Sequence, residues 1–264
     1  MSAADGYLYV KHRVATSRAA RPASRTLRLI DGLRARRHPE LALLRQEDRM
    51  IDAVLARLVS WGSRCLDVGG HIGSVAQRLC ALAGPESVQI VEASPSKARW
   101  LARRFGADRV HAVGVAEEDG ALTFYEDPDR PGYSSLKRPA GAARLRETVV
   151  PIRRLDTLFP APEAFDFVKL DVEGSELSAL RGATGLLARG RPTILFEAGP
   201  ARQNPEGAAL FEHLTEGLGY EVRAVFEVGH GTAPLTPALF ERYRTYPFLA
   251  FNYVAQVPEG THAA

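Results

Sequence analysis

The chain has 264 residues, of which 45% are hydrophobic and 25% charged, and its formal net charge at neutral pH is +3. This composition is typical of a globular protein, and the length suits one large α/β domain. No apolar run approaches the roughly 18 residues of a membrane span, and charged residues recur from Lys11 onward, where a signal peptide would have its apolar core. We therefore expect a cytoplasmic protein without a membrane partner.

The first fifty residues form a predicted basic extension. They contain eleven Lys/Arg against five Asp/Glu, and such an arm could cap the domain, mediate a homodimer or contact nucleic acid. No aromatic residues are interleaved with the arginines for base stacking, so a nucleic-acid partner is not favoured. We expect the main domain over residues 51–257 and a short tail over 258–264.

Strands and helices alternate along the main domain. In chain order we expect a helix over 46–60, a strand over 64–68, a helix over 74–83, a strand over 88–92, a helix over 96–105, a strand over 109–113, short strands over 121–125 and 148–152, a strand over 165–170, a helix over 175–188, a strand over 192–196, a helix over 207–218, and strands over 221–226 and 248–254. This alternation predicts an α/β fold with a mostly parallel sheet of seven main strands.

A glycine-rich turn joins the strand over 64–68 to the helix over 74–83. Its sequence is Cys65-Leu-Asp-Val-Gly-Gly-His-Ile-Gly73, and glycines allow a backbone to approach a ligand closely at a helix N-terminus. Glu92 follows Gly73 by 19 residues, at the end of the next strand, where an acid can accept both hydroxyls of a ribose. These features predict a nucleoside-containing cofactor.

The spacing of the glycines separates two classes of cofactor. Gly69, Gly70 and Gly73 do not match the G-x-G-x-x-G pattern that binds a dinucleotide pyrophosphate. Asp67 would repel a pyrophosphate, but it could hold the turn amides or meet an ammonium or sulfonium group. S-adenosylmethionine carries both of these cations, so it is the favoured cofactor. The alternative is a tight turn that binds no ligand.

A second motif is rich in acids and follows the strand over 165–170. In Lys169-Leu-Asp-Val-Glu-Gly-Ser-Glu176, three acids lie within six residues. Asp171, at the strand end, is placed to face the transferring methyl group or a substrate hydroxyl. Glu173 and Glu176 could position the acceptor or complement the helix dipole.

These motifs resemble the FkbM family of S-adenosylmethionine-dependent methyltransferases over about residues 60–255. The similar segments are Asp67-Val-Gly-x-x-Ile-Gly73, Glu92-Ala-Ser-Pro95, Val113-Gly-Val-Ala116, Ser134-Ser-Leu136, Arg154-Leu-Asp-Thr157, Lys169-Leu-Asp-Val-Glu-Gly-x-Glu176 and Leu195-Phe-Glu197. The resemblance implies a Rossmann-like class I methyltransferase with helices on both faces of the sheet. It also implies methylation of a hydroxyl on a small natural product or sugar. Gly70-His71 stands where the family usually has Ala-Asn.

The expected site combines a cofactor set, a catalytic set and an acceptor set. The cofactor set is Asp67, Gly69, Gly70, His71, Gly73, Glu92, Ala93, Ser94, Ala116, Glu117 and Asp171. For catalysis, Asp171 is the expected general base, with Glu197 second and His230 as a histidine candidate. The acceptor set is Tyr133, Ser134, Glu173 and Glu176.

The same acids could hold Mg²⁺, although a metal is not favoured. Two other functions stay open. One is an RNA or protein methyltransferase that uses the basic extension, and the other is a non-catalytic binding module of the same fold.

Overall fold

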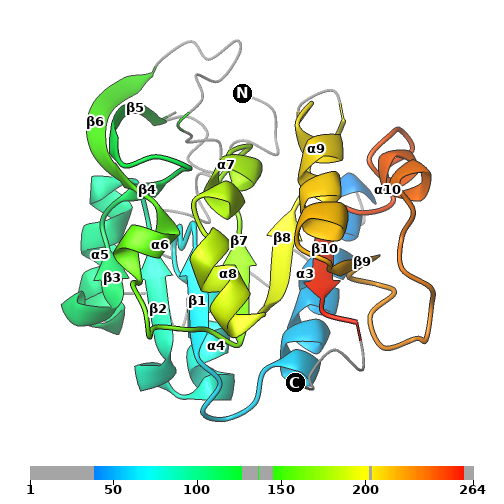
Figure 1. The fold of residues 1–264 in the computed structure, drawn as a ribbon, viewed down its shortest axis with the longest axis horizontal. Coiled ribbons are helices and arrows are strands. Elements are labelled where there is room, and N and C mark those ends of the chain that lie inside the picture. The colour runs from blue at the N-terminus through cyan, green and yellow to red at the C-terminus, as the bar shows by residue number, and fades with distance from the viewer. Residues whose placement is uncertain (1–38, 127–135, 137–144, 202–203, 259–264) are drawn as a thin grey trace.

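The computed structural model describes residues 39–126, 136, 145–201 and 204–258, and Figure 1 shows a central sheet with helices on both sides. The sheet has seven strands in the order β3-β2-β1-β7-β8-β10-β9. Their bounds are β1 Cys65–Val68, β2 Val88–Val91, β3 Val110–His111, β7 Phe167–Leu170, β8 Thr193–Glu197, β9 Glu221–Ala224 and β10 Asn252–Gln256. Within this seven-stranded sheet, β10 pairs antiparallel with β8 and β9, and the other pairings are parallel. This is the predicted α/β architecture.

Two layers of helices bury opposite faces of the sheet. One face packs against α3 Pro39–Leu58, α4 Ser74–Ala83 and α5 Pro95–Phe105. The other packs against α6 Leu155–Leu158, α7 Glu176–Arg181, α8 Thr184–Gly190, α9 Gly207–Glu212 and α10 Pro237–Tyr243. Because successive strand residues point to opposite faces, Cys65 enters the first core and Leu66 the second. None of the helices in the described ranges is both long and apolar enough to cross a membrane.

A second, three-stranded sheet follows β3 of the main sheet. It consists of β4 Gly114–Val115, β5 Gly120–Glu126 and β6 Arg146–Arg153, in the order β4-β6-β5. The strand expected over 109–113 is therefore divided, because β3 ends at His111 and the chain crosses into β4. Phe124, Val150 and Ile152 form the core of this sheet, and Leu136 packs against it.

The helix expected over 175–188 is two helices, α7 and α8, separated at Gly182 and Ala183. Gly182 lies against the backbone of Ala116, where an added Cβ would come 2.1 Å from the carbonyl oxygen. Glycine is also a weak helix former. The break between α7 and α8 therefore coincides with close packing of Gly182 against the residue that follows β4.

The ends of the domain differ from the expectation in three places. The helix expected over 46–60 is α3, which spans Pro39–Leu58. Helix α10 was not expected, although Thr236 caps it by accepting a hydrogen bond from the Leu239 amide, with proline at the first helical position. β10 starts at Asn252 rather than 248, because the segment before it turns back, with the Leu249 amide donating to the Tyr243 carbonyl.

Candidate active site

The glycine turn after β1 packs directly on β2 and β7. The amides of Gly69 and Gly70 both donate to the carbonyl of Val91, at 2.9 and 3.0 Å. Gly69 has a φ of +85°, and a Cβ there would lie 1.8 Å from the carbonyl oxygen of Asp171. Glycine is thus required at this position both for its backbone conformation and for the close approach of two strand ends.

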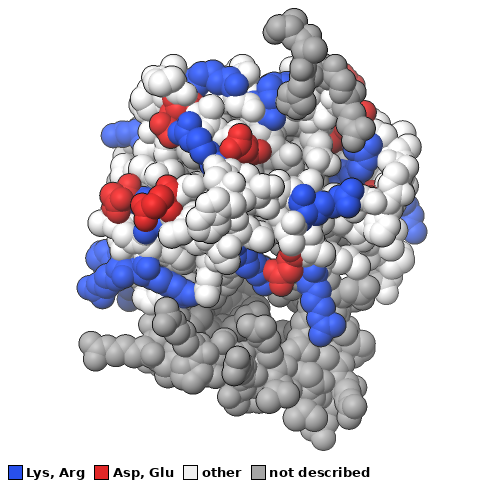
Figure 2. Space-filling view, turned by 90° about the horizontal axis from the view of Figure 1, so that it is seen from below, with Lys and Arg blue, Asp and Glu red and all other residues white. Residues whose placement is uncertain are grey.

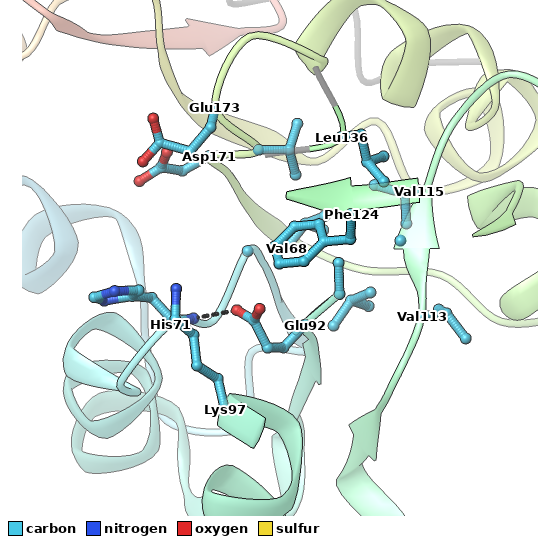
Figure 3. Close-up of a pocket in the computed structure, with 15 residues that line it drawn as sticks. Val68, His71, Glu92, Lys97, Val113, Val115, Phe124, Leu136, Asp171 and Glu173 are labelled. Carbon is cyan, nitrogen blue, oxygen red and sulfur yellow. Dashed lines mark hydrogen bonds between the residues drawn. The ribbon is translucent and has the colours of Figure 1, made fainter. Parts of the chain in front are cut away.

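Glu92 lies immediately after β2, and its carboxylate binds the glycine turn through a backbone amide. Its side chain is buried; Oε2 accepts a hydrogen bond from the His71 amide at 2.7 Å, and Oε1 accepts one from the Ser94 amide at 2.8 Å (Figure 3). Burial raises the pKa of Glu92, an effect that Lys97 and these two amides oppose. Each oxygen keeps a second lone pair, so the carboxylate can still accept the two hydroxyls of a ribose.

A pocket of about 750 Å³, including the open space at its mouth, lies beyond the ends of β1, β2 and β7. The residues that line it are Val68, Gly69, His71, Val91, Glu92, Ala93, Lys97, Val113, Gly114, Val115, Phe124, Leu136, Asp171, Val172 and Glu173. Figure 3 shows Glu92 and Lys97 on one side and Asp171 and Glu173 on the other.

The turn after β7 carries the acids on the far side. Glu173 adopts a left-handed backbone with a φ of 52°. Oε1 of Glu176, at the start of α7, accepts the amides of Val172 and Gly174, each at 3.1 Å. Glu176 therefore closes the turn that presents Glu173. Burial, reinforced by Asp171 and Glu176, raises the pKa of Glu173 to about 8.

Further carboxylates surround the buried Lys169 of β7. Its Nζ lies 3.0 Å from Oδ2 of Asp171. Burial raises the pKa of Asp67 to about 6, with Lys169 opposing the shift and Asp171 adding to it. Burial also raises the pKa of Glu197 well above its ordinary value, again reinforced by Asp171. Oδ2 of Asp67 is buried and accepts no hydrogen bond within the described residues.

The expected site residues fall into three groups. The pocket brings together Gly69, His71, Glu92, Ala93, Asp171 and Glu173. A second group lies outside its lining, and these residues are Asp67, Gly70, Gly73, Ser94, Ala116, Glu117, Glu176, Glu197 and His230. The third group, Tyr133 and Ser134, lies outside the described residues.

Members of the second group have contacts of other kinds. Ser94 caps α5, its Oγ accepting from the Lys97 amide and contacting Glu126. The amide of Glu117 donates to Ser178 Oγ. His230 is exposed in a turn after β9, where its amide donates to the carbonyl of Glu227. The structure thus leaves His230 away from the pocket, because the turn that carries it belongs to the edge strand of the sheet.

Several pocket residues are not among the expected site residues named above. Phe124 and Leu136 reach the pocket through the second sheet, and Val113 and Val115 line it just before the expected Ala116. Lys97 lines it from the first turns of α5, where only the rarity of lysine in this arginine-rich chain offered a signal. Within the described ranges, no three His, Cys, Asp or Glu side chains are grouped so as to hold a metal ion.

The pocket fits S-adenosylmethionine. Glu92 supplies acceptors for a ribose, and Val91, Val113 and Val115 supply an apolar wall for an adenine ring. Across the pocket, the carboxyl group of Asp171 would lie on the side of the cationic methionine portion. The fold is that of a class I methyltransferase, and the lining of this pocket is compatible with S-adenosylmethionine.

The sequence model described as the methyltransferase FkbM domain matches residues 67–222. The chain belongs to the FkbM methyltransferase family. No curated protein matches it.

Three solved structures of methyltransferases are similar to this chain at low identity. The FkbM methyltransferase from Methylobacillus flagellatus KT is 18% identical with a TM-score of 0.45; the match covers 74% of this chain and 43% of that one. A precorrin-6y C5,15-methyltransferase from Geobacter metallireducens GS-15 is 17% identical, with a TM-score of 0.37 and coverages of 65% and 71%. A SAM-dependent methyltransferase from Aquifex aeolicus is 15% identical, with a TM-score of 0.36 and coverages of 65% and 80%. The chain spans less than half the length of the first of these proteins.

Proposed function

We propose that the protein methylates a hydroxyl oxygen of a small organic acceptor, a natural product or a sugar, with Asp171 as the general base. The observation that carries this proposal is the position of Asp171. Its carboxylate lines the cofactor pocket, its side chain is one-third exposed (33%), and it faces Glu92 from the opposite side (Figure 3).

The chemistry needs a base because a neutral hydroxyl is a weak nucleophile. When bound, S-adenosylmethionine supplies an electrophilic methyl group, and loss of that group leaves an electron pair on a neutral thioether sulfur. Asp171 accepts the hydroxyl proton as the acceptor oxygen forms its bond to the methyl carbon, and then releases that proton to water at the exposed mouth. Glu92 and the glycine turn hold the nucleoside in place, so proximity contributes much of the acceleration.

The protonation of the neighbouring acids supports Asp171 over its alternatives. With a pKa of about 8, Glu173 keeps its proton at neutral pH and can donate a hydrogen bond to the acceptor. Glu197 does not line the pocket, and burial raises its pKa well above the ordinary value, so it is less well placed than Asp171 to serve as the base. Glu173 is therefore assigned to positioning the acceptor.

An exposed aromatic cluster supports a ring-bearing acceptor. The rings of Tyr246 and Phe248 are 5.8 Å apart, and those of Phe248 and Phe251 are 5.6 Å apart. Tyr246 is 81% exposed. The carbonyl of Phe251 accepts the amide of Ala198, directly after Glu197, so this cluster begins beside the acidic strand ends. Aromatic faces bind flat or apolar ring surfaces.

Surface charge favours a small molecule over a nucleic acid. On the face shown in Figure 2, the described Lys and Arg side chains occur in separate groups with uncharged and acidic surface between them. Nucleic-acid binding uses a clustered basic surface. Residues 1–38 of the basic extension lie outside the described residues. The free thiols of Cys65 and Cys80 suit the reducing cytoplasm that we propose as the location.

The test is transfer of label from methyl-labelled S-adenosylmethionine to a panel of hydroxylated compounds and their amine counterparts, with and without a chelator. We expect label on hydroxyls, with no effect of the chelator. Asp171→Asn should lower kcat about 100-fold with little change in KM, whereas Asp108→Asn, an exposed matched control, should retain full activity. Transfer to amines alone, or full activity of Asp171→Asn, would contradict the proposal.

A further inference from the structure

Lys169 is a buried cation directly beneath the acids of the pocket. Its side chain is 5% exposed and lies in β7, where strand pairing places Asp67 beside it on β1 and Leu195 beside it on β8. Alternate residues of a strand share a face. Asp171, two residues after Lys169, and Glu197, two residues after Leu195, therefore lie on this same face.

The contact with Asp171 reaches that carboxylate from inside the sheet. Nζ of Lys169 lies 3.0 Å from Oδ2 of Asp171, and Lys169 is absent from the pocket lining that includes Asp171. Lys169 thus binds Oδ2 of Asp171 from the buried side, and the exposed part of the Asp171 side chain is left for an acceptor. Burial alone would lower the pKa of Lys169, but Asp171, Glu197 and Asp67 together raise it.

Without this cation, Asp171 would be surrounded mostly by carboxyl groups. The titratable groups around it come from every element packed there, and they are Asp67 at β1, Glu92 at β2, Lys97 on α5, Glu173 and Glu176 at the turn into α7, and Glu197 at β8. Lys97 is the other cation in this set, and it projects from the opposite side of the pocket (Figure 3). Repulsion among neighbouring carboxylates favours their protonated forms.

We propose that Lys169 is a positioning residue, whose ammonium keeps the Asp171 carboxylate charged and pointed toward the pocket without touching acceptor or cofactor. The proposal rests on the proposed function, in which Asp171 receives the hydroxyl proton. Removing one partner of a buried ion pair leaves the other charge uncompensated. Loss of Lys169 should therefore act on catalysis through Asp171.

The experiment compares Lys169→Met and Lys169→Arg, each with and without Asp171→Asn. The carboxyl groups are titrated by ¹³C NMR, affinity for S-adenosylhomocysteine is measured by calorimetry, and turnover is measured against pH. In Lys169→Met we expect the Asp171 signal to titrate at least about one pH unit higher than in the wild type. Affinity should change less than about 3-fold, and the acidic limb of the kcat–pH profile should move to higher pH by the same amount as the Asp171 titration.

The other variants separate positioning from a merely structural role. Lys169→Arg should restore the wild-type titration, and Lys169→Met should change kcat less than about 2-fold in the Asp171→Asn background. Arg244→Met is the matched control, because Arg244 is a buried cation that binds the carbonyls of Gly199 and Asn204, outside the pocket. It should lower stability and leave the Asp171 titration unchanged.

An unchanged Asp171 titration in Lys169→Met, or an equal loss of kcat with and without Asp171, would overturn the proposal. If Lys169→Met does not fold, the Lys169→Met/Asp171→Asn pair should fold, because it removes both charges; failure of both variants would count against the proposal. Failure of the proposed function gives a different result, since wild-type turnover on hydroxyls would then be absent while the NMR titration still reports on the pair.

Discussion

The backbone amide of His71 donates to Oε2 of Glu92 at 2.7 Å, which ties the glycine turn after β1 to the acid that ends β2. His71 adopts a left-handed backbone with a φ of 47°. Asparagine and histidine enter this region more readily than most residues. This conformation accounts for histidine at the position where the family usually has asparagine, and it assigns His71 to the turn.

Glu92 should control cofactor affinity through both of its oxygens. Glu92→Ala removes the acceptor for two backbone amides as well as the proposed ribose contact. Since hydrogen bonds to a charged group contribute about 1.5–3 kcal/mol each, we expect affinity for S-adenosylhomocysteine to fall at least about 10-fold in calorimetry. Glu118→Ala, at an exposed residue, is the control. Equal affinity in the two variants would show that Glu92 does not bind the cofactor.

Gly69→Ala should destabilise the protein more than its backbone conformation alone explains. The added Cβ would meet the Asp171 carbonyl at 1.8 Å, so β1 and β7 must separate. We expect the free energy of unfolding in urea to fall by more than about 2 kcal/mol. Gly62→Ala is the matched control, because Gly62 also has a positive φ but an added Cβ there meets nothing within 4 Å. A similar loss in both variants would show that the clash is relieved without cost.

Asp67 should make stability fall as the pH rises. Burial raises its pKa from 3.8 to about 6, so the folded state holds a proton that the unfolded state has released between these values. The stabilisation from that proton is complete below about pH 4 and lost above about pH 6, a change of up to about 3 kcal/mol.

Asp67→Asn keeps a neutral side chain at all pH values. It should therefore be more stable than the wild type at pH 7 and similar to it at pH 4, as measured by chemical denaturation. A wild type that is the more stable of the two at pH 7 would refute this account. If Asp67 also contacts a cationic part of the cofactor, the same variant will bind S-adenosylmethionine more weakly.

Glu173→Gln should retain activity at neutral pH, in contrast to Asp171→Asn. With a pKa of about 8, the Glu173 carboxyl is protonated at pH 7, and glutamine preserves its uncharged, hydrogen-bonding character. We expect kcat within about 3-fold of the wild type at pH 7. A loss as large as that of Asp171→Asn would identify Glu173 as the base instead.

The aromatic cluster should affect acceptor binding rather than chemistry. Phe248→Ser and Tyr246→Ser remove ring surface beside the acidic strand ends, so KM for a ring-bearing acceptor should rise about 5- to 10-fold with kcat nearly unchanged. Trp61→Ser is the control, because Trp61 is 78% exposed and lies at the turn before β1, by the opposite ends of the strands. An unchanged KM in both cluster variants would direct the search for the acceptor site elsewhere.

Much of the site could be predicted from local patterns. The turn from Asp67 to Gly73, helix α4 and the acid after β2 appear where the sequence predicts them, because short-range periodicity and glycine placement specify a strand, a turn and a helix. The rule that ligands bind beyond the carboxyl ends of parallel strands also predicts Asp67, Asp171 and Glu197 at one edge of the sheet. The family, and with it the cofactor class, follows from these motifs.

Other features depend on contacts between distant segments. Leu136 and Phe124 reach the pocket through the packing of the second sheet, and the break between α7 and α8 coincides with the contact of Gly182 with Ala116. Burial raises the pKa values of Glu173 and Glu197, and the buried Lys169 lies 3.0 Å from Asp171. Both features depend on strands that are far apart in the chain and adjacent in the fold. The sequence by itself predicted the fold class and the cofactor class, because local patterns encode them; only the tertiary structure decided which acids are buried next to one another, because contacts between distant strands set their surroundings.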